Sequence, residues 1–188
     1  VRETVGYALS IGGRVHSPSG GPGTIAALPV DSELLGGTGK LESTVSDEAV
    51  LTAARAQRIV PSEGPASTLP AVLRAARAGH AGAGALLAER ARVLGAAVAL
   101  LRDMLNPDDL VVGGQAFTEY PEGIELVQRA FAARTVLGPR DIRVTAFGNR
   151  VQEAGAGVVS LGGLYADPIA AMRRAQLRRG EAGVLGAS

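Results

Sequence analysis

The side chains best suited to acid–base or metal chemistry near neutral pH are the two histidines, His16 and His80. Neither forms a recognised catalytic pattern with a serine or a carboxylate, and the sequence contains no zincin, P-loop or α/β-hydrolase motif. It also contains no cysteine, which excludes disulfides, thiolate metal ligands and cysteine nucleophiles. We therefore expect both histidines in loops or on the surface, and we identify no catalytic residue, no metal site and no cofactor.

Three further segments offer other routes to ligand binding. Residues 36–40 (GGTGK) are reminiscent of a phosphate loop, but the P-loop spacing fails and no Ser or Thr follows Lys40, so a glycine-rich surface loop is expected. Gly113 and Gly114 follow a strand-like stretch, where the absence of Cβ would either admit a nucleotide or form a tight turn. An arginine cluster near the C-terminus would either bind phosphate or compensate a helix dipole. The cluster comprises Arg173, Arg174, Arg178 and Arg179.

The composition excludes several classes of protein. Of the 188 residues, 46% are hydrophobic and only 3% aromatic, which indicates a globular domain with an aliphatic core. With 19 basic and 18 acidic residues the net charge is +1, so the chain lacks the basic field that holds nucleic acid backbones. No apolar run approaches the ~18 residues of a membrane span, which predicts a soluble cytoplasmic protein without a membrane partner. Because the chain begins at Val1 in strand-like sequence, we expect a trimmed product with more protein upstream.

Helices and strands alternate along the chain in a pattern typical of an α/β domain. Gly12 and Gly13 suit the turn of a hairpin across residues 4–15. Apolar side chains recur every three or four residues over 85–105, which predicts a long helix that Asn106–Pro107 ends. The other expected elements are helices at 47–56 (capped by Ser46), 68–79 (capped by Thr68, ended by Gly79), 122–134, 152–161 and 167–179, a buried strand at 110–112 and a strand at 142–147.

The order of these segments resembles the C-terminal part of the ROK family (repressors, open reading frames and sugar kinases). The segments that carry the likeness are VGYALSIGGR (5–14), residues 20–23, IAALPV (25–30), GKLES (39–43), 94–95, 106–107, LVVGG (110–114) and AGA (154–156). The resemblance implies an α/β fold, the actin-like ATPase (ribonuclease H-like) lobe, with a mixed sheet and packed helices. Residues 1–179 would form a C-terminal effector and dimerisation lobe, and 180–188 a flexible tail. The first lobe and the DNA-binding domain of such proteins would be absent from this chain.

The same resemblance implies that the family's zinc and phosphate ligands are lost. The three zinc-binding cysteines of the family fall on Glu33, Leu35 and Lys40, and a zinc-binding histidine falls on Ala27. The Gly-Thr-Gly segment that helps to hold ATP phosphates corresponds to residues 2–4 (RET). No metal and no phosphate cradle are therefore expected.

A degenerate sugar site is also implied. Thr24 stands where the family has a sugar-binding glutamate, whereas Glu42 keeps its residue type. Glu42 would either accept hydrogen bonds from sugar hydroxyls or be a leftover acidic residue in the first turn of a short helix. Gly113 and Gly114 match the family's nucleotide-side turn, which also has a purely structural role.

These expectations converge on a regulator. We expect the C-terminal effector and dimerisation part of a ROK-type transcriptional regulator with degenerate sugar, zinc and ATP sites. Its partners would be a second copy, DNA bound through an N-terminal helix-turn-helix outside this chain, and a small sugar effector. The alternatives are a ROK-type sugar kinase whose catalytic lobe lies elsewhere, and a standalone dimeric scaffold.

Overall fold

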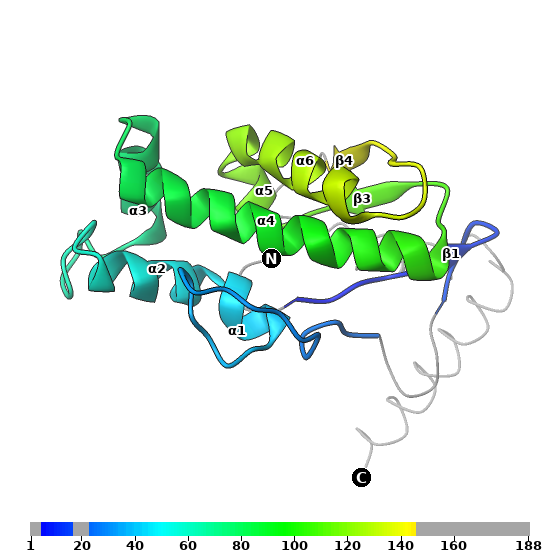
Figure 1. Cartoon of the computed structure of the whole chain (residues 1–188), viewed down its shortest axis with the longest axis horizontal. Helices are drawn as coiled ribbons and strands as arrows, with labels where there is room; N and C mark the ends of the chain where they lie inside the picture. The colour runs from blue at the N-terminus through cyan, green and yellow to red at the C-terminus, as the bar shows by residue number, and fades with distance from the viewer. Residues whose placement is uncertain (1–4, 17–22, 146–188) are drawn as a thin grey trace, which may run out of the picture. The chain divides into compact units, whose positions relative to one another are not determined.

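The computed structural model describes residues 5–16 and 23–145 (Figure 1). The chain divides into Val1–Gly148 and Asn149–Ser188, and the described residues belong to the first of these units. The elements are β1 (Ser10–Ile11), β2 (Arg14–Val15), α1 (Leu41–Val45), α2 (Asp47–Ala56), α3 (Leu69–Arg77), α4 (Ala81–Leu105), β3 (Leu110–Val112), α5 (Gln115–Thr118), the 3-10 turn η1 (Pro121–Gly123), α6 (Ile124–Arg134) and β4 (Ile142–Val144). The expected helices at 152–161 and 167–179, the arginine cluster and the tail lie outside the described residues.

Helix α4 is the longest element and lies between α6 on one side and α1 and α2 on the other (Figure 1). It begins at Ala81 rather than at residue 85, because His80 Nδ1 accepts a hydrogen bond of 3.3 Å from Ala83 N and caps the first turn. Asn106 ends the helix as predicted, in a left-handed conformation with φ of 45°. The second histidine, His16, lies exposed at the end of the hairpin, as expected.

Helix α6 approaches α4 so closely that one position of α4 has no room for a side chain. A Cβ at Gly95 would lie 2.7 Å from both Ala130 Cβ and the Val127 carbonyl oxygen, and 2.9 Å from Phe131 N. Phe131 is fully buried in this contact region. Gly95 therefore sets the distance between the two helices.

The junction between α1 and α2 is fixed to α4 by a buried guanidinium. Arg90 donates from Nε to the Val45 carbonyl over 2.8 Å and from Nη2 to Asp47 Oδ1 over 2.6 Å. Burial lowers the pKa of Arg90, while the Asp47 carboxylate opposes this shift. Ser46 caps α2 as predicted, since its Oγ accepts from Ala49 N at 3.2 Å.

Helix α3 agrees with the predicted boundaries but not with the predicted cap. Thr68 occupies the N-cap position without a side-chain capping hydrogen bond, whereas Gly79 follows the helix with φ of 85°, as expected. Arg77 joins the end of α3 to η1, because its Nε donates to Glu122 Oε1 at 3.0 Å and its Nη2 to the Glu119 carbonyl at 2.7 Å.

Strands β3 and β4 pair in parallel, with Leu110 opposite Ile142 and Val112 opposite Val144. The prediction of a buried strand at 110–112 is wrong: Val111 is 60% exposed, because successive side chains of a strand point to opposite faces. The crossover passes through α6 and a short helix, α5, that the sequence pattern did not predict.

Two side chains fasten the segment between α6 and β4. Asp103 of α4 accepts a 2.5 Å hydrogen bond from the Thr135 hydroxyl, which is the main cause of its lowered pKa, and bonds from Val136 N and Leu137 N act in the same direction. Gln128 of α6 accepts from Ile142 N over 2.9 Å. The segment that follows α6 is thereby held to α4, and the first residue of β4 is held to α6.

The predicted hairpin is confirmed. Strands β1 and β2 pair antiparallel, and Gly12 and Gly13 form the turn with φ of 57° and 77°, a conformation in which glycine avoids Cβ strain. Within residues 5–16 and 23–145, antiparallel and parallel pairings occur in two separate two-stranded sheets rather than in the single mixed sheet expected. Gly6 contributes only an isolated bridge to Thr24, which is consistent with the weak strand preference of glycine.

The close approach of α4 and α6 makes a prediction. Gly95→Ala should lower the free energy of unfolding by about 1 to 3 kcal/mol, because the added methyl group meets main-chain atoms of α6 that cannot move independently. Gly84→Ala, on the same helix with no atom within 4 Å of the new Cβ, should instead stabilise the chain by up to about 1 kcal/mol. Urea unfolding of the two variants measures both values. Equal effects of the same sign would contradict this account of the packing.

Candidate functional site

The two expected sugar-site residues, Thr24 and Glu42, lie together, and both bind the main chain of Val5. Glu42 Oε2 accepts a hydrogen bond of 2.8 Å from Val5 N, and Thr24 Oγ1 donates one of 3.2 Å to the Val5 carbonyl. The Thr24 hydroxyl also accepts from Ala26 N at 3.1 Å. The side chains that could face a polyol therefore hold a strand segment of the protein itself.

Helix α1 carries Glu42 to this position. The first two residues of α1 bind residues 26–28, since Leu41 N donates to the Leu28 carbonyl at 2.8 Å and Glu42 N to the Ala26 carbonyl at 3.0 Å. Leu41 is fully buried and anchors the helix in the core. Glu42 is only partly buried, in the first turn of a short helix, as its alternative interpretation expected.

The segment at 23–27 carries few polar side chains. Gly23 packs against Tyr7, whose ring would lie 2.6 Å from a Cβ at that position. Ala27 is exposed and offers no ligand atom where the family has a histidine. Thr24 is thus the one polar side chain of this segment, and its hydroxyl is already engaged.

An apolar anchor and a set of hydroxyl groups hold the loop at 31–40 together. Leu35 is 5% exposed and packs with α2, α3 and α4 in an apolar cluster, whereas Glu33 and Lys40 are exposed. Ser32 Oγ accepts from Leu35 N at 3.2 Å. The Arg92 guanidinium lowers the pKa of the Glu89 carboxyl, and the Ser32 hydroxyl acts in the same direction, which connects the loop to α4.

A second hydroxyl group closes the far end of this loop. Ser43 Oγ accepts from Thr38 N at 3.1 Å, lies 2.9 Å from Thr38 Oγ1 and donates to the Lys40 carbonyl at 3.0 Å. Thr44 Oγ1 donates to the Gly36 carbonyl at 3.4 Å. The GGTGK segment is a glycine-rich surface loop, as predicted, and its hydrogen bonds run to α1.

Gly113 and Gly114 form the turn between β3 and α5. Gly114 has φ of 100°, and its carbonyl accepts from Phe117 N at 3.1 Å and from Thr118 N at 3.2 Å, so it begins the short helix. Phe117 then points into the core, where it is 4% exposed. The Gly114 carbonyl thus has a structural role at the start of α5.

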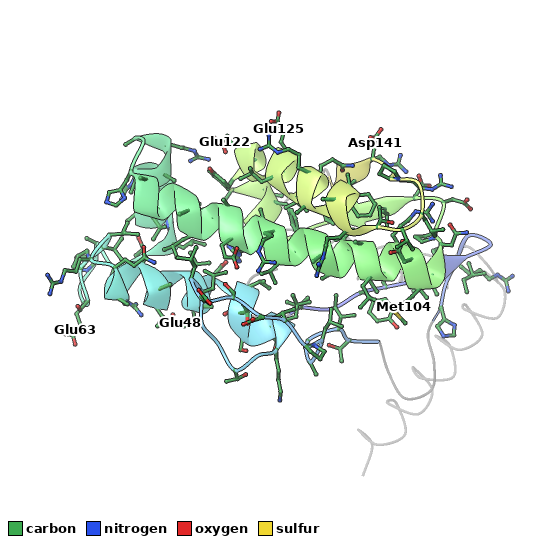
Figure 2. The ribbon with its side chains drawn as sticks, in the orientation of Figure 1. Glu48, Glu63, Met104, Glu122, Glu125 and Asp141 are labelled. Atoms are coloured by element: carbon green, nitrogen blue, oxygen red, sulfur yellow. The ribbon has the colours of Figure 1, made fainter. Side chains whose placement is uncertain are left out.

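Sequence reasoning found Thr24 and Glu42 but missed Val5, the residue that joins them. No signal in the sequence marks Val5, because its contribution is a main-chain N–H and C=O. Within the two described stretches, no group of three or more His, Cys, Asp or Glu side chains is placed to hold a metal ion. The carboxylates labelled on the α6 side, Glu122, Glu125 and Asp141, point outward from the molecule (Figure 2).

A shallow open groove runs between α6 and β4, lined by Ile124, Glu125, Gln128, Arg129, Asp141 and Ile142. Its charged side chains alternate in sign, and Gln128 already accepts a hydrogen bond from the main-chain N–H of Ile142.

Among the helices of the described residues, none is long and apolar enough to cross a membrane.

The chain is similar to mycobacterial regulators over most of its length. It is 71% identical over 92% of its residues to Transcriptional regulator Mb0495 of Mycobacterium bovis and to Transcriptional regulator Rv0485 of Mycobacterium tuberculosis. It spans 41% of the length of each of these relatives. No protein-family model matches the chain.

Solved structures share its fold at low sequence identity. A ROK family glucokinase from Streptomyces griseus, in complex with glucose and AMPPNP, is 20% identical with a TM-score of 0.65, over 80% of this chain and 55% of that one. A ROK hexokinase from Thermus thermophilus is 21% identical with a TM-score of 0.66, and the match covers 80% of this chain and 51% of the hexokinase. A ROK family transcriptional regulator, a homolog of the E. coli MLC protein, is 22% identical with a TM-score of 0.61. That match covers 77% of this chain and 39% of the regulator. The predicted fold class, the α/β actin-like ATPase lobe, is confirmed.

The cysteine-free loop makes a prediction. Leu35→Ala should destabilise the chain by about 2 to 4 kcal/mol, because it empties a buried apolar position. Leu34→Ala, at the adjacent and 44% exposed position, should change stability by less than about 0.5 kcal/mol. Denaturant unfolding measures both.

The same loop should bind no stoichiometric zinc, because no thiolate stands at Glu33, Leu35 or Lys40. Elemental analysis tests this directly, and a chelator should leave the melting temperature unchanged. One zinc per chain would refute this interpretation.

Proposed function

We propose that the chain is the C-terminal effector and dimerisation part of a ROK-type transcriptional regulator, because it is similar in sequence to mycobacterial transcriptional regulators and in fold to a ROK family transcriptional regulator. The observation that carries the proposal is the 71% identity to mycobacterial transcriptional regulators. In this proposal residues 1–179 form the effector lobe, 180–188 a tail, and the regulator works in the cytoplasm.

The hydrogen bonds and burial of the residues at the family's ligand positions support a regulator whose sugar, zinc and ATP sites are degenerate. Thr24 and Glu42 bind the main chain of Val5, and the loop that carries Glu33, Leu35 and Lys40 is closed by apolar burial and hydroxyl groups. A dimerising scaffold needs packing rather than catalytic polar groups. A small sugar would then act as a weak effector at Glu42 and Thr24.

DNA contact belongs, in this proposal, to a part of the regulator outside this chain. The net charge of +1 gives no basic field, and in the described part of the chain several arginines, among them Arg55, Arg77, Arg90 and Arg92, form ion pairs with carboxylates. A two-fold dimer would place two helix-turn-helix heads on the half-sites of a palindromic operator.

A sugar kinase is the second candidate, favoured by the fold shared with a ROK glucokinase and a ROK hexokinase. Phosphoryl transfer needs an ordered sugar pocket and a phosphate cradle. By the resemblance, Thr24 replaces a sugar-binding glutamate and Ala27 a zinc-binding histidine, and the Gly-Thr-Gly cradle corresponds to residues 2–4, outside the described residues. The regulator is therefore the better supported function.

Selection from a random duplex library tests the proposal. A protein of the relatives' length that contains this chain should enrich an inverted repeat, whereas residues 1–188 alone should enrich no sequence. The same protein should not phosphorylate D-glucose with ATP above background. Hexose phosphorylation without sequence-specific DNA binding would favour the kinase instead.

Sedimentation equilibrium tests the dimerisation role. Residues 1–188 should self-associate, because a dimerisation lobe buries apolar surface against its second copy. A matched measurement on Gly84→Ala, which lies on α4 in open space, controls for changes in stability alone. A strictly monomeric, stable chain would contradict the assignment of dimerisation to this lobe.

A further inference from the structure

Strand β4 pairs on one side only. Among the described residues its partner strand is β3, and Thr145 N donates to the Val112 carbonyl across this pairing at 2.9 Å. The main-chain groups of successive residues in a strand face opposite edges, so those of Ile142 and Val144 face away from β3. We call the outward main-chain groups of Arg140, Ile142 and Val144 the β4 edge.

The side chain of Gln128 occupies part of the place that a neighbouring strand would take. Its carboxamide donates from Nε2 to the Arg140 carbonyl at 2.9 Å and accepts from Ile142 N, also at 2.9 Å. A neighbouring strand would offer the same two kinds of group, an N–H and a C=O. Gln128 thus covers two of the three residues of the β4 edge with groups that a main chain could replace.

Space for another main chain lies directly beside this edge. The open groove between α6 and β4 has a volume of about 480 Å³, and its lining includes Gln128, Asp141 and Ile142. An extended segment can therefore lie along β4 once the Gln128 side chain turns aside.

The charges beside the β4 edge are self-complementary. Asp141 and Arg143 are both exposed and lie on either side of the buried Ile142, and Asp141 points outward from the molecule (Figure 2). In an antiparallel pair centred on Ile142, the Asp141 of each copy stands opposite the Arg143 of the other, and opposite charges at such positions attract. The main chain fits this register, because directly opposed residues that exchange two hydrogen bonds must both face the partner strand, as Ile142 does.

We propose that the β4 edge is a contact surface between two copies of this chain, in which β4 pairs antiparallel with β4 of the second copy and replaces Gln128. The proposal rests on the dimerisation role assigned to this lobe and names the surface that carries it. A two-fold axis through this pairing closes the assembly, because each copy has then used its β4 edge. In the single chain Gln128 competes for the same main-chain groups, which limits the strength of the contact and protects the edge from unspecific pairing.

Charge reversal tests the register. Asp141→Arg opposes two arginines and Arg143→Asp opposes two aspartates, so each variant should weaken self-association of residues 1–188 by roughly tenfold. An equimolar mixture of the two variants should associate as strongly as the unaltered chain, because every contact then joins opposite charges. Sedimentation velocity measures all of these. Glu63→Arg, at an exposed carboxylate far from β4 (Figure 2), is the matched control for net charge and should change nothing.

The mixture also separates the contact from effects within one chain. Arg143 pairs with Asp109 of its own chain at 2.5 Å, and the loss of this ion pair persists in the mixture. Recovery of association in the mixture therefore supports the contact between copies. Association that is unchanged in both variants, or weakened in both and not recovered in the mixture, would overturn it.

Gln128→Ala tests the competition. It frees Arg140 and Ile142 and should tighten self-association by roughly fivefold to tenfold, because the second copy no longer displaces existing hydrogen bonds. Arg134→Ala, at an exposed position of the same helix, is the matched control and should have no effect. Association of Gln128→Ala that is no tighter than that of the unaltered chain would contradict the competition.

Amide exchange locates the contact in the same variant. Exchange of the Ile142 amide in Gln128→Ala should slow as the protein concentration rises. Exchange of the Thr145 amide, which is bonded to Val112 within the chain, should not depend on concentration and reports that the variant is folded. Exchange at Ile142 that is independent of concentration while the chain associates would overturn the β4 edge as the contact.

These results are separable from the proposed function. Self-association of the unaltered chain that ignores both charge reversals would keep the dimerisation role and reject the β4 edge. A monomeric unaltered chain, with association in Gln128→Ala that follows the charge pattern, would keep the edge pairing and reject the dimerisation role.

Discussion

The close contact between α4 and α6 at Gly95 is the constraint on which the rest of the described structure depends. A helix buried on two sides must carry small residues where its neighbour's main chain approaches, and here a Cβ would overlap Val127 and Phe131. With α6 held at this distance, Asp103 reaches the loop after α6 and Gln128 reaches the first residue of β4. The parallel pairing of β3 and β4 follows from these anchors.

On the other side of α4, the buried charge of Arg90 sets the position of α1 and α2. Arg90 is 4% exposed, and a buried guanidinium requires hydrogen-bonding partners. It donates hydrogen bonds to the Val45 carbonyl and to Asp47 at the junction of the two helices. Along α4, Arg90 stands between the residues of two apolar clusters, one containing Leu86 and the other Leu94. Fixing this junction also fixes α1, and with it the carboxylate that binds Val5.

The cysteine-free loop at residues 31–40 is held by a buried side chain and a set of hydrogen bonds. In a structural zinc site, metal–thiolate bonds supply folding energy directly. Here the loop is held by the burial of Leu35, by the hydrogen bond that Thr38 N donates to Ser43 Oγ, and by the one that Ser43 Oγ donates to the Lys40 carbonyl. Apolar burial and local hydrogen bonds maintain the loop that leads into α1, so the position of Glu42 does not require a metal.

The sequence by itself determined the features that depend on local chemistry. Ser46 caps α2, Gly12 and Gly13 turn the hairpin, and Asn106 ends α4, because each acts through its own backbone or through a neighbour within a few residues. The likeness of motif order likewise indicated the fold and marked positions 24 and 42 as the candidate site.

Only the tertiary structure decided what those two residues do. Thr24 and Glu42 are 19 and 37 residues from Val5 along the chain, and their shared partner is a main-chain amide that every residue type except proline possesses. The sequence pattern also did not predict the start of α4 at Ala81, after the His80 cap, or the 60% exposure of Val111. Hydrophobic periodicity shows where apolar residues recur along the chain, but it does not show that an uncommon residue caps a helix. The burial of each face of a strand depends on which elements pack against that strand.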